Sequence, residues 1–184
     1  MPEVSRLLSD RTSGVQDSAD RLFRLLYDEL RNMAGAQLQR AGGRRVLGTT
    51  TLVHESYLRF MKKGELAPED RDHFLAYASH VMRSIVVDAA RRQLASKRGA
   101  GQPHLMLSEE AIADVTASDV QIIRLHEALE ELAELEPRMA KVIEMRYFGG
   151  LGEEEIAHVL SVSLRTVQRD WEKARALLSS ALKD

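Results

Sequence analysis

The chain has 184 residues, a formal net charge of −2 and no Cys, and 44% of its residues are hydrophobic. This apolar fraction excludes global disorder, and the lack of Cys excludes a disulfide framework or a thiolate zinc site. The N-terminus lacks the basic and apolar pattern of a signal peptide, and no apolar run approaches the length of a membrane span. We therefore expect a cytoplasmic protein with no membrane partner.

The sequence predicts an all-α fold, because helical spacing of apolar residues recurs while alternating runs of β-branched residues do not appear. Three helices are expected in the first half of the chain, each separated by glycine or proline signals. Their expected extents are Leu22 to Gly35 or Gly42–Gly43, the helix after Thr49–Thr51 that stops at Gly64, and the helix from Pro68 to Lys97–Arg98.

Charge divides the chain into three parts. Residues 1–98 carry a net +5, residues 99–121 a net −4 with no Lys or Arg, and residues 122–184 a net −3. The middle part also contains Gly99, Gly101 and Pro103, which predicts a flexible acidic linker. An ordinary acidic surface loop with one helical turn near Ser108–Ala113 is the alternative. We expect an N-terminal extension (1–15), two small, mutually mobile helical domains (16–98 and 122–184) and the linker (99–121) between them.

Four helical segments are predicted in the last part of the chain, and Pro137 suits the first position of one of them. They are 122–135, 137–148, 153–160 and 164–182. The stretch from Leu151 to Leu178 has the pattern of a helix-turn-helix, with inward-facing Ile156 before the turn and Ser163 as a cap of the next helix.

The last helix has one apolar stripe and one polar face. Val167, Trp171, Ala174 and Leu178 are spaced to lie on the buried side. Near its start, a helix-turn-helix presents the opposite face to base edges in the major groove, where Arg and Gln read guanine and adenine. A solvated polar face is the alternative, and Ser161 stands where such turns often carry Gly. The polar residues predicted to contact DNA are Arg165, Thr166, Gln168, Arg169, Glu172, Lys173 and, at phosphate, Arg175.

Two blocks of sequence point to a family. The first runs from Phe74-Leu75-Ala76-Tyr77 to Asp88-Ala89-Ala90-Arg91-Arg92, and the second from Pro137-Arg138 to Leu151 followed by Glu155-Ile156-Ala157. Residues 16–98 resemble region 2 of bacterial sigma factors, and residues 122–182 resemble region 4. The whole chain resembles an extracytoplasmic-function (ECF) sigma factor of the sigma-70 family.

This resemblance implies a role in transcription initiation. Such proteins bind core RNA polymerase, with region 2 on the β′ clamp and region 4 on the β flap, and direct it to promoter DNA. Region 4 would read the −35 element as duplex, and region 2 would melt the −10 element with a basic surface suited to single strands. The linker would thread toward the RNA exit channel. The residues that the resemblance assigns to the −10 element are Tyr77, Arg83, Arg91, Arg92, Lys97 and Arg98.

One segment departs from the family pattern. Where the family has acidic residues that meet the polymerase clamp, this chain has Gly48 and Thr49–Thr51. Loss of these charges should weaken polymerase binding, and phosphorylation would restore negative charge. We therefore expect a Ser/Thr protein kinase to act on Thr51, or otherwise on Thr50 or Thr49; helix capping by one threonine is the alternative. The predicted polymerase-binding residues are Thr51, Leu52, His54, Glu55 and Tyr57.

The sequence gives little support for catalysis. Its six His residues show no metal-ligand spacing, and its acidic runs are typical of solvated helix faces, so we expect no enzyme, no metal and no cofactor. A stand-alone helix-turn-helix repressor and a helical adaptor that does not bind DNA remain alternatives. The sequence leaves open whether an anti-sigma factor is a further partner.

Overall fold

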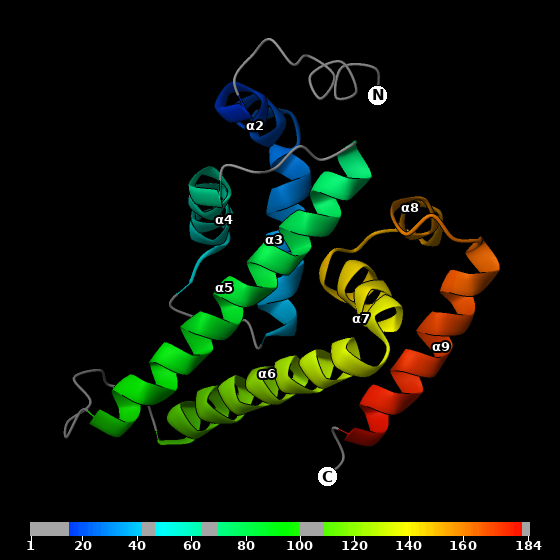
Figure 1. Ribbon diagram of the computed structural model, residues 1–184. Coiled ribbons are helices and arrows are strands. Elements are labelled where there is room, and N and C mark those ends of the chain that lie inside the picture. The colour runs from blue at the N-terminus through cyan, green and yellow to red at the C-terminus, as the bar shows by residue number, and fades with distance from the viewer. Residues whose placement is uncertain (1–14, 42–46, 64–69, 100–108, 182–184) are drawn as a thin grey trace.

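The computed structural model describes residues 15–41, 47–63, 70–99 and 109–181. In these ranges the chain forms helices joined by turns, without a strand, which confirms the all-α prediction (Figure 1). None of the helices described there is long and apolar enough to cross a bilayer. The predicted extension before residue 15 and most of Gly99–Ser108 lie outside the described residues.

The N-terminal helical group consists of α2 (Val15–Leu25), α3 (Tyr27–Arg40), α4 (Thr49–Lys63) and α5 (Arg71–Gly99). The single helix expected from Leu22 is divided in two, because the backbone leaves the helical region at Leu26 (φ −103°, ψ 15°). Leu26 is buried at this bend. Gly35 does not end a helix but lies inside α3, which stops at Arg40.

Aromatic side chains join three helices of this group. Phe23 of α2 meets Phe60 of α4 and Phe74 of α5 edge to face, with ring centroids 5.0 and 5.5 Å apart, and Phe60 lies 5.3 Å from Phe74. Such aromatic pairs stabilise the fold beyond the contribution of apolar burial alone. Phe74 is 1% exposed, so it serves the core.

The C-terminal helical group consists of α6 (Glu109–Leu135), α7 (Pro137–Ile143), the π-helical turn η1 (Glu144–Phe148), α8 (Glu153–Val159) and α9 (Leu164–Ala181). Residues 109–121, expected to belong to a flexible linker, form the first half of α6. The reason is tertiary: α6 packs on α5, and Ile122 at its midpoint contacts the main core. Packing of an apolar stripe stabilises a helix that local propensity alone leaves marginal.

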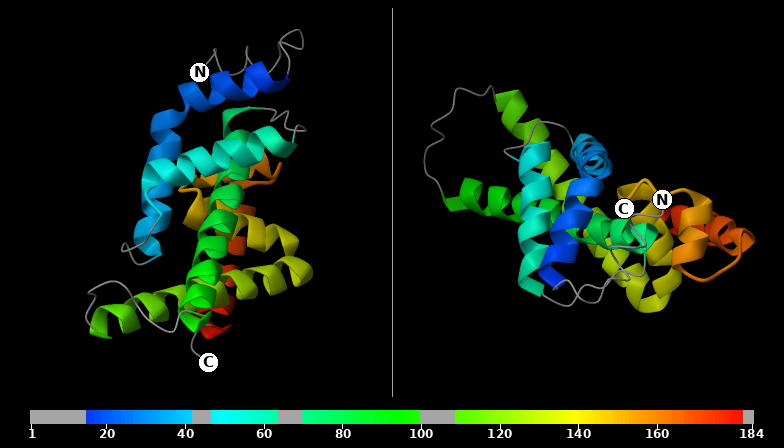
Figure 2. Two further views of the ribbon diagram at one scale, coloured as in Figure 1. Left: turned by 90° about the vertical axis from the view of Figure 1, so that its left-hand side faces the viewer. Right: turned by 90° about the horizontal axis from the view of Figure 1, so that it is seen from above.

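The two helical groups share an apolar core, and the C-terminal group has a second, smaller one of its own. Helix α5 runs between them and contacts α3 and α4 on one side and α6, η1 and α8 on the other (Figures 1 and 2). Buried residues of the C-terminal group belong to the same apolar cluster as those of α2–α5. The structure therefore differs from two separately folded, mobile bundles. These C-terminal core residues are Val142, Met145, Leu151, Ile156 and Val167.

Two glycines reverse the chain after η1. Gly150 has φ +69°, a left-handed conformation that glycine adopts without a steric penalty. It allows the N–H of Leu151 to donate to the carbonyl of Met145 at 3.1 Å, which satisfies a carbonyl group of η1. At Gly149 a Cβ atom would lie 2.5 Å from the carbonyl oxygen of Met145 and 2.7 Å from Cδ1 of Leu151.

We predict opposite effects of alanine at two glycines. Gly149→Ala should lower the free energy of unfolding by about 1–3 kcal/mol, because the backbone must shift to admit the Cβ atom. Gly35→Ala should raise it by about 0.5–1 kcal/mol, since a Cβ there meets no atom within 4 Å and alanine is the better helix former. Urea unfolding followed by circular dichroism measures both, and equal stability of the two variants would contradict the packing at Gly149.

Candidate nucleic-acid interface

The turn between α8 and α9 has the geometry of a helix-turn-helix. Ser161 adopts φ 52°, the left-handed conformation at which such turns often carry glycine. The N–H of Ser161 donates to the carbonyl of His158 at 3.1 Å, and that of Val162 to Ala157 at 3.0 Å. These bonds satisfy the last carbonyls of α8 and aim the chain into α9.

Helix α9 begins at a cap that the sequence predicted. The hydroxyl oxygen of Ser163 accepts the backbone N–H of Thr166 at 3.2 Å, as an N-cap serine does. Val167 and Ala174 are fully buried, and Trp171 and Leu178 are partly buried, so the predicted apolar stripe is confirmed.

The opposite face of α9 carries the residues predicted to contact DNA, and almost all of them are exposed. Thr166 is half-buried beside Ser163. Because the stripe packs inward, the first two turns of α9 present a continuous polar surface of the kind that enters a major groove. The exposed residues are Arg165, Gln168, Arg169, Glu172, Lys173 and Arg175.

Neighbouring helices fix the orientation of α9. Asp170, which is 2% exposed, accepts a hydrogen bond from Nε of Arg138 on α7 at 2.6 Å. Gln168 donates to Glu153 of α8 at 2.8 Å, and Arg146 pairs with the same carboxylate. The hydrogen bond from Gln168 and the guanidinium of Arg146 hold the pKa of Glu153 below its usual range.

The start of α4 has no acidic residue in its first turn. Thr50 and Thr51 are exposed there, and Thr49 is half-buried. Arg44 and Arg45, the two basic residues shortly before these threonines, lie outside the described residues.

The predicted polymerase-binding set divides by burial. Thr51, His54 and Glu55 are exposed, while Leu52 is fully buried and belongs to the core. Tyr57 is half-buried, and its hydroxyl donates to Asp20 of α2, a bond that raises the pKa of the tyrosine.

The residues predicted to contact the −10 element all lie on α5, with different exposures. Arg91 and Arg92 are exposed. Tyr77 is half-buried, with its ring 4.8 Å from that of Phe60. Lys97 and Arg98 are in the last turns of α5, and their side chains are outside the described part.

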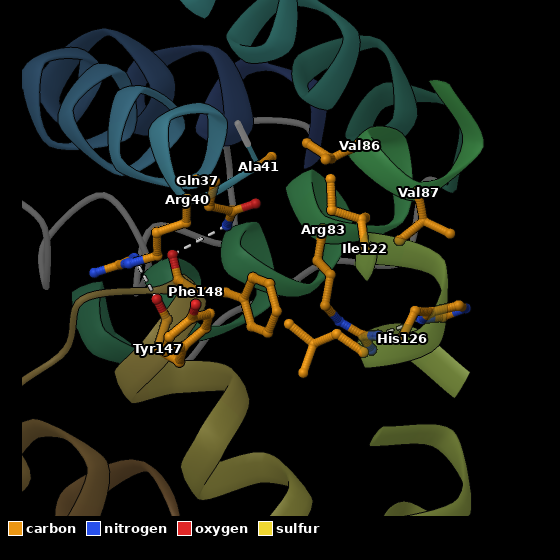
Figure 3. A pocket seen from close by; sticks show the side chains of 11 residues that line it. Gln37, Arg40, Ala41, Arg83, Val86, Val87, Ile122, His126, Tyr147 and Phe148 are labelled. Atoms are coloured by element: carbon orange, nitrogen blue, oxygen red, sulfur yellow. Dashed lines mark hydrogen bonds between the residues drawn. The ribbon is translucent and has the colours of Figure 1, made fainter. Parts of the chain in front are cut away.

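Arg83 differs from the other cations, because it is 5% exposed and faces the C-terminal group (Figure 3). Its Nε donates to Oε1 of Glu144 at 2.6 Å, and its Nη2 to Glu130 at 3.2 Å. In this arrangement Arg83 does not lie on the basic surface that was expected to contact the −10 element. A buried guanidinium is tolerated only with such partners.

Glu144 accepts hydrogen bonds from two residues of α5, His80 and Arg83. Burial raises the pKa of Glu144, but the hydrogen bond from His80 and the charge of Arg83 more than offset this and lower it. His126, next to Arg83, has a lowered pKa because of burial and the nearby guanidinium. Sequence reasoning missed Glu144, since nothing near it in the chain marks it as a partner of α5.

Two backbone carbonyls of η1 accept hydrogen bonds from side chains of α3 (Figure 3). The amide of Gln37 donates to the carbonyl of Phe148 at 3.0 Å, and Arg40 donates to the carbonyl of Tyr147. The Arg40 guanidinium also lies 4.9 Å from the centre of the Tyr147 ring, within the range of a cation–π interaction. The end of η1 is therefore held against α3 as well as α5.

We predict that the buried ion pair stabilises the protein more than an exposed one. Glu144→Gln should lower the free energy of unfolding by about 2 kcal/mol, because Arg83 loses its main charged partner. Asp88→Asn breaks the pair with Arg59, whose side chains are 40% and 44% exposed, and should change it by less than about 1 kcal/mol. Urea unfolding of both variants tests this, and equal losses would contradict it.

The comparisons with known proteins agree with this geometry. The family model described as ECF sigma factor matches residues 1–184. No curated protein matches the chain. The match covers both helical groups and the connection between them, so it does not rest on the helix-turn-helix alone. The chain belongs to the ECF sigma factors, and its place is therefore among the proteins that act in transcription initiation.

Proposed function

We propose that this protein is an alternative sigma factor that directs core RNA polymerase to its promoters through the exposed face of α9 and the basic surface of α5. The observation that carries the proposal is the capped, firmly oriented start of α9, whose cationic and amide side chains face outward. Arg165 and Gln168 are the residue types that pair with guanine and adenine in a major groove. Reconstituted run-off transcription with core polymerase tests it.

We further propose that phosphorylation of the first turn of α4 activates the protein, with Thr51 as the main site and Thr50 or Thr49 as the alternatives. The exposure of Thr51 and the absence of an acid in this turn support the proposal. A phosphate there gains from the helix dipole and from the free N–H groups of the first turn. It would also provide the negative charge that a basic polymerase clamp requires.

Binding measurements with the same polymerase and promoter DNA would distinguish two other functions. A stand-alone repressor would bind promoter DNA without polymerase, and a helical adaptor would bind neither. No feature of the described residues favours either of them over a sigma factor.

For DNA recognition, we expect Arg165→Ala to weaken promoter binding by the reconstituted holoenzyme about tenfold or more, as loss of a base contact does. The loss should shrink when the −35 element is replaced by unrelated sequence. The matched control is Arg124→Ala, which removes an exposed arginine from α6. Fluorescence anisotropy with labelled promoter DNA measures both variants, and equal binding by both would exclude the proposed role of α9.

For activation, protein carrying phosphothreonine at position 51 should bind core polymerase at least tenfold more tightly than unmodified protein. The physical reason is the charge of roughly −1.5 to −2 that the phosphate adds. Thr51→Ala should abolish promoter activation in cells, whereas Thr49→Ala and Thr50→Ala should retain it and serve as controls. A fully active triple alanine variant would exclude phosphorylation as the switch.

A further inference from the structure

A histidine-rich cluster lies where the two helical groups meet, away from the surfaces discussed above. Asp70 directly precedes α5, His73 is in its first turn, and His158 is near the end of α8. One ligand atom from each of the three side chains lies within 4.8 Å of the others. Oδ1 of Asp70 is 2.9 Å from Nδ1 of His73, and Oδ2 is 2.5 Å from Nε2 of His158.

The carboxylate of Asp70 is already held in place. Its Oδ1 accepts the backbone N–H groups of Asp72 and His73 at 2.9 and 3.0 Å, so the side chain caps α5. The two imidazole rings stand nearly perpendicular, 76° apart, with their centroids at 5.7 Å. Each ring thus directs a nitrogen toward the same carboxylate from a different helix.

The charge around the cluster favours a cation. Arg71 is the neighbouring base, but its guanidinium is shared among the carboxylates of Glu29, Asp72 and Glu155. Together with Asp70, these make four carboxylates against one guanidinium. These groups therefore carry an excess of negative charge, which attracts a cation.

The set of donors indicates which cation would bind. Two imidazole nitrogens and one carboxylate oxygen suit zinc, which is held by three such ligands and a water in many open sites. Magnesium and calcium prefer a full shell of oxygen ligands. The His158 side chain is 57% exposed, so solvent reaches the cluster and a water can occupy the fourth position.

We propose that Asp70, His73 and His158 form a zinc site that clamps the start of α5 to α8. Zinc bonds of about 2.0–2.2 Å would replace the present hydrogen bonds to Asp70. Because two ligands come from the N-terminal group and one from the C-terminal group, the bound ion stabilises the arrangement in which the two groups are packed together. A ligand that binds this arrangement alone shifts the population toward it.

The first test measures binding by the untagged, metal-free chain. Zinc should bind with a stoichiometry of one in competition with a chromogenic chelator, and magnesium should not compete. His158→Ala should weaken zinc binding at least tenfold, whereas His54→Ala removes an exposed histidine from α4 and should leave it unchanged. Absence of zinc binding in the micromolar range, or equal binding by wild type and His158→Ala, would overturn the site.

The second test measures whether zinc holds the two helical groups together. The chain has no Cys, so Leu58→Cys on α4 and Leu177→Cys on α9, both at exposed positions, allow specific labelling with a donor and an acceptor dye. Under mild urea, zinc should increase energy transfer in this protein and should not do so when His158→Ala is added. An equal response in both proteins would refute the clamp. These tests need neither polymerase nor DNA, so their failure is separate from a failure of the proposed function.

Discussion

The burial of one guanidinium governs how the two halves of this protein meet. Arg83 projects from the middle of α5 into the C-terminal group, where it is 5% exposed and paired with Glu144 and Glu130. Removing a charge from water is costly unless the partners are in place, and here the main partner comes from η1. The contacts of Gln37 and Arg40 with η1 carbonyls depend on the same approach of the helices. The shared apolar core and the charged contact therefore reinforce each other.

This arrangement divides the functional surfaces into two classes. The outer face of α9 and the first turn of α4 are exposed while the two groups are together. Arg83, by contrast, would have to leave Glu144 before it met DNA. The proposed zinc ion would favour the packed arrangement over one in which the two groups separate. It would shift that equilibrium only by its difference in affinity for the two arrangements.

Much of the local structure could be predicted from short-range signals. Ser163 as a cap, Pro137 at a first helical position and the glycine turn at 149–150 all follow from backbone chemistry within a few residues. The apolar stripe of α9 follows from spacing alone. The start of α6 was not predicted, because residues 109–121 lack a clear helical pattern in the sequence; α6 as a whole packs on α5. Leu52 was also misplaced by sequence reasoning. It was expected at the polymerase-binding surface, but its side chain is buried in the core.

Local sequence patterns predict the helical fold class, the helix-turn-helix and the face of α9 that points outward, since each depends on contacts between residues close in the chain. The packing of the helices, by contrast, sets which charges are neutralised and which side chains meet across the two groups. Arg83 and Glu144 are far apart in sequence, as are His73 and His158, and no spacing rule relates them. The physical reason is that ion pairing and metal ligation depend on distances of a few ångströms in space. Those distances are set by how α5 packs against η1 and α8.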